Sequence, residues 1–322
     1  MPENLRALPK IRDSLSTIYL AYGRLKQLKS GVVFENKSGR VAIPVANLCA
    51  LLLGPGTSVT HRAVHTIGRS GCSMLWVGEE GVRFYAHGHG ETRKGYALQK
   101  QAALVADPAK RMRVVARMYR MRFGEPLPSG LTLNEVRGRE GARVRRAYRQ
   151  AAAHYGIAWR GRQYDRFDWE ESNPSNRALS AANACLNGVC HSAIVSAGYS
   201  AGLGFIHQGK QLSFVYDVAD LYKTTLTLPL AFATASEGHG QLERVVRKRC
   251  RDGFRRIGLL SRIIPDIQKL LDLSTSVPIP DGFDVDHDPA APSAWWEPPP
   301  EVDRTLTGDA IGSPRVSTNG TG

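Results

Sequence analysis

Cysteine and long apolar runs are both scarce in this 322-residue chain. It has 5 cysteines, an odd number that excludes a secreted scaffold held by paired disulfides and favours a reducing compartment. The most apolar run, residues 41–53, includes Pro44 and Asn47, and it is shorter than the roughly 20 apolar residues that a membrane helix needs. The N-terminal sequence has no apolar signal-peptide core, so we expect a cytoplasmic protein without a membrane partner.

Residues 54–61 are rich in glycine but lack the Gly-Lys-Ser/Thr ending of a phosphate-binding loop. This absence excludes an NTPase of that type. A Ser/His/Asp set can be assembled from the many candidates in any chain of this length, so such a set does not by itself predict a serine hydrolase. The chemistry therefore has to come from other residue types.

Acidic residues are under-represented relative to basic ones. The chain has 43 Lys+Arg against 29 Asp+Glu and a formal charge of +14. Residues 273–322 carry −6 and residues 1–272 carry +20, with about three arginines for each lysine. A body this basic favours a polyanionic partner, and arginine is suited to binding phosphate through its planar fork. The alternative explanation for the positive charge is a codon bias that favours arginine.

The pattern of the first 86 residues predicts a β-rich domain. Residues 31–45 have the form strand, polar turn, strand, and residues 73–77 predict a buried strand. Residues 60–69 predict a short helix with Thr60 as its N-cap. The glycine-rich polar segment 87–95 is the expected linker.

Residues 96–273 predict an all-α catalytic domain, which makes the fold class α+β. Helical spacing occurs over 96–106, 108–123, 131–155, 176–197, 213–233 and 240–273, and an interruption is expected near Gly138 and Gly141. Residues 274–322 are rich in proline and acidic residues and predict a disordered tail. Trp295 and Trp296 in that tail are a candidate docking point.

Three places in the expected helical domain combine hard metal ligands with basic residues. Glu140 lies among arginines, His207 lies on an expected loop, and Asp217 and Asp220 are three positions apart on one helix face. Carboxylates with an imidazole suit Mg²⁺ or Mn²⁺ better than a structural zinc site, which would use cysteine. Each residue also has a structural alternative: a surface ion pair for Glu140, a hydrogen-bonded loop residue for His207, and a helix-starting acid for Asp217.

The motifs around these residues resemble one known family. They are Arg-Gly-Arg-Glu-Gly-Ala-Arg-Val-Arg at 137–145, Trp-Arg-Gly-Arg-Gln-Tyr-Asp at 159–165, Gly-Phe-Ile-His-Gln-Gly-Lys at 204–210 and Leu-Ser-Phe-Val-Tyr-Asp-Val-Ala-Asp at 212–220. In this order they resemble the CRISPR-associated adaptation integrase, most closely its type I-E subfamily. The likeness covers roughly residues 10–275.

The resemblance implies a metal-dependent DNA endonuclease or integrase. The metal ligands of the family fall on Glu140, His207 and Asp220, and the metal is Mg²⁺ or Mn²⁺. Asp217 matches a supporting acid, and Lys223 is the fourth catalytic residue, because a helix would place it beside Asp220 and the scissile phosphate.

The resemblance also assigns DNA contacts. Tyr22 matches an aromatic residue that caps a duplex end, and Arg62 lies close to an expected basic position that is Ser58 here. Other positions match residues that hold the DNA backbone or its single-stranded ends, namely Arg83, Lys210, Arg244 and Arg247. Tyr164 and Tyr216 match positions near the pocket that senses the protospacer-adjacent motif.

Family members act as homodimers clamped on a small ferredoxin-like subunit in a heterohexamer. The complex binds duplex prespacer DNA with splayed 3′ ends and joins each 3′-OH to the CRISPR repeat by transesterification. Two other functions stay open on the residues alone. One is a structure-selective nuclease for branched DNA, and the other is a non-catalytic nucleic-acid scaffold.

Overall fold

The computed structural model describes residues 17–29, 31–48, 50–90, 95–162 and 173–272, without the side chains of Asn47 and Tyr96. All of them belong to one unit of the chain, residues 1–281. The expected tail 274–322, with Trp295 and Trp296, lies outside the described residues, as does Tyr164.

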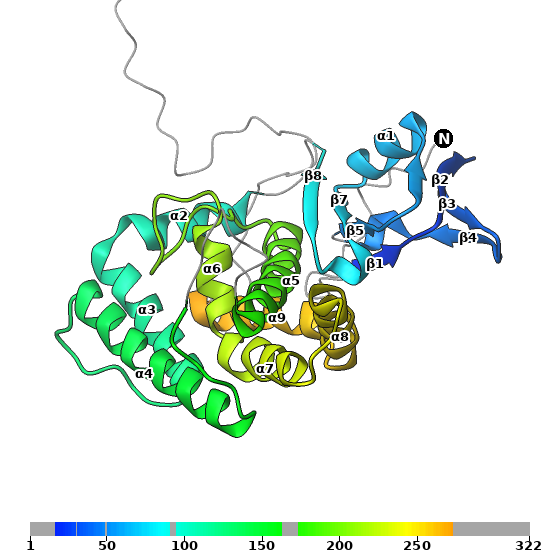
Figure 1. Cartoon of the computed structure of the whole chain (residues 1–322). Helices are drawn as coiled ribbons and strands as arrows, with labels where there is room; N and C mark the ends of the chain where they lie inside the picture. Colours follow the sequence, from blue (N-terminus) through cyan, green and yellow to red (C-terminus); the bar gives the residue numbers. More distant parts are fainter. Residues whose placement is uncertain (1–16, 30, 49, 91–94, 163–172, 273–322) are drawn as a thin grey trace, which may run out of the picture. The chain divides into compact units, whose positions relative to one another are not determined.

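The N-terminal region contains two four-stranded sheets (Figure 1). One sheet has the order β1-β5-β7-β8 and the other β4-β3-β2-β6. The first sheet is parallel except for the β7–β8 pair, and in the second sheet β2 pairs antiparallel with β3 and parallel with β6. The strand bounds are β1 Thr17–Leu20, β2 Gly23–Leu28, β3 Gly31–Asn36, β4 Gly39–Ile43, β5 Ala50–Leu53, β6 Thr57–Val59, β7 Ser73–Val77 and β8 Phe84–Gly88.

Strand β5 forms the last four residues of the most apolar run of the sequence, 41–53. Its side chains alternate, so that Leu51 and Leu53 pack in one core while Ala50 and Leu52 pack in another. The first core also holds Ile67 of α1 (His61–Arg69). A strand buried on both faces reads as a continuous hydrophobic stretch, which explains the run without a membrane.

The remaining helices are numbered along the chain. Their bounds are α2 Tyr96–Ala106, α3 Pro108–Phe123, α4 Leu133–His154, α5 Pro174–Ser196, α6 Ser213–Asp220, α7 Leu228–Ser236, α8 Leu242–Arg256 and α9 Leu259–Leu271. Two 3-10 helices, η1 (Val45–Asn47) and η2 (Glu79–Gly81), and one π-helical turn, η3 (Lys223–Thr227), complete the described elements. The α+β fold class is confirmed, with a strand-rich N-terminal region and a larger helical part.

Helix α5 is the centre of the helical core, with α6, α7, α8 and α9 packed around it (Figure 1). It is long and apolar enough to span a membrane, but 72% of its most apolar window is buried inside the protein. Small residues let neighbours approach closely. A Cβ added at Gly188 would lie 2.8 Å from the backbone carbon and oxygen of Val82, which follows η2.

Several predicted elements are confirmed: the strands within 31–45, the helix after Thr60, and the strand at 73–77. The Thr60 side chain caps α1 by accepting from the Ala63 N–H at 3.3 Å. Two details were wrong. Helix α4 runs unbroken through Gly138 and Gly141, because two glycines at about 1 kcal/mol each do not outweigh its cap and packing. Strand β8 continues to Gly88, so the strand includes the first two residues of the expected linker.

Candidate active site

Three elements carry the expected catalytic side chains. Glu140 is on α4, Asp217 and Asp220 are on α6, and His207 is on the loop that precedes α6. A reciprocal capping box fixes the start of α4: the Glu135 carboxylate accepts from Thr132 N–H at 2.7 Å, and Glu135 N–H donates to the Thr132 hydroxyl at 3.4 Å. The local sequence thus fixes where α4 begins, and Glu140 lies on the buried face of that helix.

Asp217 organises the loop that carries His207. Its buried carboxylate accepts the backbone N–H groups of Phe205, Ile206 and His207 at 2.5, 3.0 and 2.9 Å. Its Oδ1 also lies 2.7 Å from His207 Nδ1. This contact raises the pKa of His207 above its ordinary value, against the opposing effect of burial. The pair fixes the ring orientation and directs Nε2 away from Asp217.

Two arginines hold the other side of the same loop. Arg111 Nε donates to the Phe205 carbonyl at 2.7 Å, and Arg137 Nη2 donates to the Ile206 carbonyl. Gly204 is required here, since an added Cβ would meet the His207 carbonyl at 2.3 Å. The backbone around His207 is therefore held through both its N–H and its C=O groups. Arg137 is part of a recognised motif but had no predicted role, and Arg111 had no signal in the sequence.

Glu140 and Asp220 both pair with one cation, the Arg122 guanidinium. The sequence did not predict a role for Arg122. Arg122 Nη1 lies 3.6 Å from Glu140 Oε1 and 3.5 Å from Asp220 Oδ2. Burial raises the pKa of Glu140 above its usual range, and Arg122 opposes this shift. Burial acts in the same direction on Asp220, but the charges of Lys223 and Arg122 outweigh it and lower the pKa of that carboxyl.

Lys223 takes the position expected for it beside Asp220. Its Nζ lies 2.6 Å from Asp220 Oδ1. The residue begins η3, three positions after Asp220, which ends α6. Asp220 therefore faces two cations, Lys223 and Arg122, and stays ionised at neutral pH.

The donor set fits a hard divalent cation in its chemistry, since two carboxylates and an imidazole are available. These side chains are not arranged as a complete metal-binding site in the structure. Within the described ranges, no three His, Cys, Asp or Glu side chains are gathered closely enough to hold a metal ion. The position between Glu140 and Asp220 is instead held by the Arg122 guanidinium.

The predicted DNA-binding residues are distributed over the strand-rich region, the His207 loop and α8. Tyr22 is 68% exposed in the turn between β1 and β2, with a φ of 57°. A turn of this kind projects the ring into solvent, where it is available for stacking on a base pair. Arg62 is exposed on the first turn of α1, and Lys210 is exposed at the end of the His207 loop.

Arg83 and Arg247, from different parts of the chain, lie near the same thiol. Both act on the thiol of Cys185, whose pKa is lowered first by a hydrogen bond with Cys250 and then by these two charges. Arg244 is exposed one turn earlier on α8. Tyr216 meets the His207 ring edge-on, with 5.8 Å between ring centroids.

Residues 198–202 read Gly-Tyr-Ser-Ala-Gly and match the pattern of a serine-hydrolase nucleophile elbow. An elbow lies between a strand and a helix, whereas this segment follows α5 and precedes the His207 loop. Ser200 is tied to α2 instead: its N–H donates to Gln101 Oε1 at 2.8 Å, and its carbonyl accepts from Gln101 Nε2. The Ser200 backbone is therefore held by α2, and the segment lacks the strand-to-helix geometry of an elbow.

Comparison with known proteins identifies the family. A CRISPR-associated endonuclease Cas1 from Thermus thermophilus is 46% identical over 301 residues, which is 93% of this chain and 92% of the relative. The Cas1 endonuclease of Escherichia coli is 42% identical over 81% of this chain and 86% of its own length. The chain belongs to the Cas1 family. The family profile for CRISPR-associated protein Cas1 matches residues 121–247, which include all four expected catalytic residues.

Solved structures agree with the Cas1 assignment. A crystal structure described as a TtCas1–DNA complex has a TM-score of 0.75 and 47% identity, covering 82% of this chain and 99% of the other. A casposase bound to an integration product has a TM-score of 0.57 at 11% identity, covering 80% of this chain and 96% of the other, and so shares the fold. Cas1 membership supports a nuclease or integrase that acts on DNA.

Proposed function

We propose that this Cas1 protein is a metal-dependent DNA integrase of the type I-E branch. It binds prespacer DNA and joins the 3′-OH ends to the CRISPR repeat. One observation carries the proposal: two buried or partly buried carboxylates, Glu140 and Asp220, are gathered around a single positive charge. Beside them, His207 is oriented by a fully buried aspartate. The type I-E assignment rests on the four motifs between residues 137 and 220.

Glu140, His207 and Asp220 would hold Mg²⁺ or Mn²⁺. When bound, such an ion polarises a phosphodiester and neutralises charge at phosphorus. The other tasks belong to the chain itself. Asp217 orients the imidazole of His207, and Lys223 places an ammonium group at the edge of Asp220, where it can interact with a phosphate oxygen.

The reaction needs no protein nucleophile. The 3′-OH of the incoming strand forms a new P–O bond while the P–O3′ bond of the repeat strand breaks. The attacking hydroxyl loses one proton and the released 3′ oxygen gains one, so atoms and charges balance without a co-reactant. Catalysis then depends on positioning and on charge stabilisation, which suits a site made of fixed acids and bases.

The partners follow from the same family resemblance. We propose a homodimer that assembles with a small ferredoxin-like subunit into a heterohexamer on duplex DNA. The +20 body supports DNA as the ligand, since phosphate neutralisation by Lys and Arg supplies most non-specific affinity. A cytoplasmic location agrees with the reducing compartment favoured by the five cysteines.

The test is a strand-joining assay on a supercoiled plasmid that carries a repeat, with the partner subunit and Mg²⁺ or Mn²⁺. Changing Glu140, His207 or Asp220 to Ala should abolish joining and leave duplex binding largely intact. Glu237→Gln is the matched control, because that carboxylate is exposed and pairs with Arg249. Full joining by all three variants would refute the proposal. Cutting of branched DNA without joining would indicate the nuclease, and metal-independent binding alone would indicate the scaffold.

A further inference from the structure

Arg122 occupies an unusual position for a structural ion-pair residue. It lies on the last turn of α3, and its side chain is 6% exposed. Its Nη1 is 3.5–3.6 Å from a carboxylate oxygen of Glu140 and of Asp220. Both distances exceed those of ordinary N–H···O hydrogen bonds, about 2.7–3.2 Å. The guanidinium is thus held between the two acids by charge, without close hydrogen bonds.

One other nitrogen of the guanidinium lacks a partner, although the group lies over the Phe123 ring, 5.1 Å from its centroid. Arg122 Nε is buried and has no hydrogen-bond partner among the described residues. An unpaired buried donor costs on the order of 1–3 kcal/mol. Arg122 is therefore placed to balance the charges of Glu140 and Asp220, although this position leaves its Nε without an acceptor.

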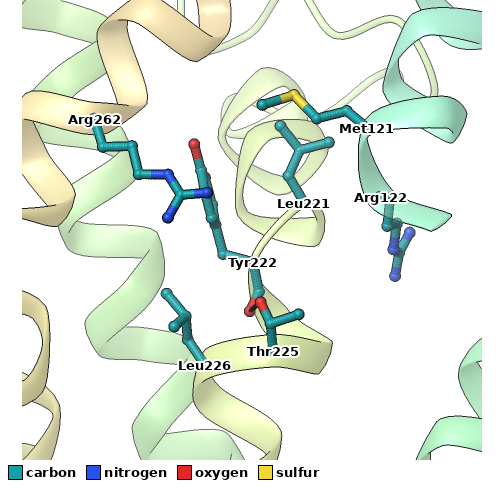
Figure 2. A pocket seen from close by; sticks show the side chains of 7 residues that line it. All are labelled: Met121, Arg122, Leu221, Tyr222, Thr225, Leu226 and Arg262. Carbon is teal, nitrogen blue, oxygen red and sulfur yellow. Dashed lines mark hydrogen bonds between the residues drawn. The ribbon is translucent and has the colours of Figure 1, made fainter. Parts of the chain in front are cut away.

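A cavity adjoins the same side chain. It has a volume of about 130 Å³ and is lined by Arg122, by Met121 before it, and by residues of η3 and its flanks and of α9, namely Leu221, Tyr222, Thr225, Leu226 and Arg262. Figure 2 shows Arg122 and Arg262 on opposite sides of Tyr222. A water molecule takes about 30 Å³ in the liquid, so the cavity has room for a planar guanidinium. No carboxylate lines it, so it does not bind the side chain in place of the acids.

A divalent cation and a guanidinium cannot both lie between these carboxylates. Two like charges a few ångströms apart in a partly buried site repel strongly, because screening there is weak. Either cation balances the two acids, which would repel each other if left alone. Metal binding and the Arg122 position are therefore alternatives.

We propose that Arg122 is a built-in counter-ion that competes with the catalytic metal. It holds Glu140 and Asp220 together while the site has no metal, and it turns toward the adjoining cavity when a divalent cation binds. It is a positioning residue and does not touch the substrate. This inference rests on the proposed metal-dependent function, which supplies the cation.

The size of the effect follows from a two-state competition. When only a fraction of molecules has Arg122 away from the acids, the apparent dissociation constant for the metal rises by the inverse of that fraction. If that fraction is about one tenth or less, removing the guanidinium should lower the apparent Kd for Mn²⁺ at least about tenfold. A fixed structural ion pair predicts the opposite, since losing it would loosen the ligands and weaken binding.

The experiment measures Mn²⁺ binding by calorimetry on the full chain without DNA. Arg122→Met keeps the side-chain length and removes the charge. We expect its Kd for Mn²⁺ to be about tenfold lower than that of the unchanged chain. In EDTA, its Tm should be lower than that of the unchanged chain. Adding Mn²⁺ should raise the Tm of the variant by more than it raises the Tm of the unchanged chain. Adding Glu140→Gln to Arg122→Met should remove the tight binding and so assign it to this site.

Arg117→Met is the matched control. Arg117 is on the same helix and pairs with Asp272 at 3.6 Å, so its loss should leave Mn²⁺ affinity unchanged. If Arg122→Met does not fold, Arg122→Gln is the second neutral variant, with the same expected tightening. Equal or weaker Mn²⁺ binding by the neutral variant, while the unchanged chain binds Mn²⁺, would overturn the role of Arg122 and leave the metal centre intact. Absence of Mn²⁺ binding by both proteins would overturn this inference and the metal-dependent function together.

Discussion

Asp217 Oδ1 lies 2.7 Å from Nδ1 of His207, and the same carboxylate accepts three consecutive backbone N–H groups of the loop that carries this histidine. One buried acid thus fixes the position of a backbone segment and the direction of a ring. With Nδ1 engaged, Nε2 is the nitrogen available to a ligand, and it has no hydrogen-bond partner among the described residues. Asp217 therefore positions His207, and its supporting role in catalysis remains a prediction.

Asp217→Asn should lower strand joining by about 10–100-fold, the usual effect of losing the acid behind a ligating histidine. An asparagine keeps the size of the side chain but has one acceptor oxygen in place of two. The His207 pKa, followed by NMR of its ring, should fall in parallel. A normal joining rate together with a lowered His207 pKa would separate the two effects and contradict this role.

The stability of the metal-free protein should depend on pH through His207. Its folded-state pKa is raised, mainly by the bond to Asp217, so folding favours the protonated ring. The added stability is complete below the unfolded value of about 6.5 and is lost as the pH rises through the higher folded value. We expect the gap in unfolding free energy between the unchanged chain and His207→Gln to be wider at acidic than at alkaline pH, measured by urea denaturation in EDTA.

Asp217→Asn serves as the control for that series. Without the carboxylate, replacing His207 by Gln should change stability by nearly the same amount at every pH. A pH-dependent gap that persists in this background would place the source of the effect elsewhere.

The close approach at Gly188 predicts a large effect from a small substitution. Gly188→Ala should destabilise the fold by about 1–3 kcal/mol, because its Cβ would meet the Val82 backbone at 2.8 Å. Gly138→Ala is the matched control on α4, where an added Cβ has nothing within 4 Å. It should stabilise the protein by about 0.5–1 kcal/mol through helix propensity. Chemical denaturation midpoints distinguish the two, and equal effects would contradict the packing at Gly188.

Helix α8 offers a comparison between arginines that differ in partner: Arg244 donates to the Gln241 side chain at 3.0 Å, whereas Arg249 pairs with a carboxylate. If Arg244 and Arg247 contact phosphates, changing both to Gln should lower the slope of log affinity against log salt by about 1.8, or 0.9 for each contact. Arg249 on the same helix is paired with both oxygens of Glu237, at 2.8 and 2.5 Å. Arg249→Gln should therefore change the slope much less. Similar slopes for all three proteins, measured by fluorescence anisotropy with a duplex, would exclude phosphate contacts at Arg244 and Arg247.

The sequence predicted those features that depend on residues close together in the chain. The Thr60 cap and the strands within 31–45 were predicted from their own residues, and the candidate catalytic residues were named from motifs and the family resemblance. Arg122 was missed because its partners lie 18 and 98 positions away, and no local pattern encodes such contacts. The same holds for Arg111 and the Phe205 carbonyl, 94 positions apart.

The two wrong details have different physical reasons. At Gly138 and Gly141, the N-terminal cap and the tertiary packing of α4 outweigh the low helix propensity of glycine. At the end of the sheet, the pairing of His87 with Leu75 extended a strand into a segment whose glycines indicated a linker. The predictions for Tyr164, Trp295 and Trp296 remain predictions.

The π-helical turn η3 sets the rotational phase between two helices. Leu228 N–H bonds back to the Lys223 carbonyl, five residues earlier, one more than in an α-helix. Each residue turns an α-helix by about 100°, so η3 rotates the acidic face of α6 relative to the buried face of α7 that carries Phe232. Removing one residue from η3 would change this rotation by about 100° and would turn Asp220 away from Glu140 if α7 kept Phe232 packed. The length of this turn therefore determines whether the acids of α4 and α6 in this Cas1 chain face each other.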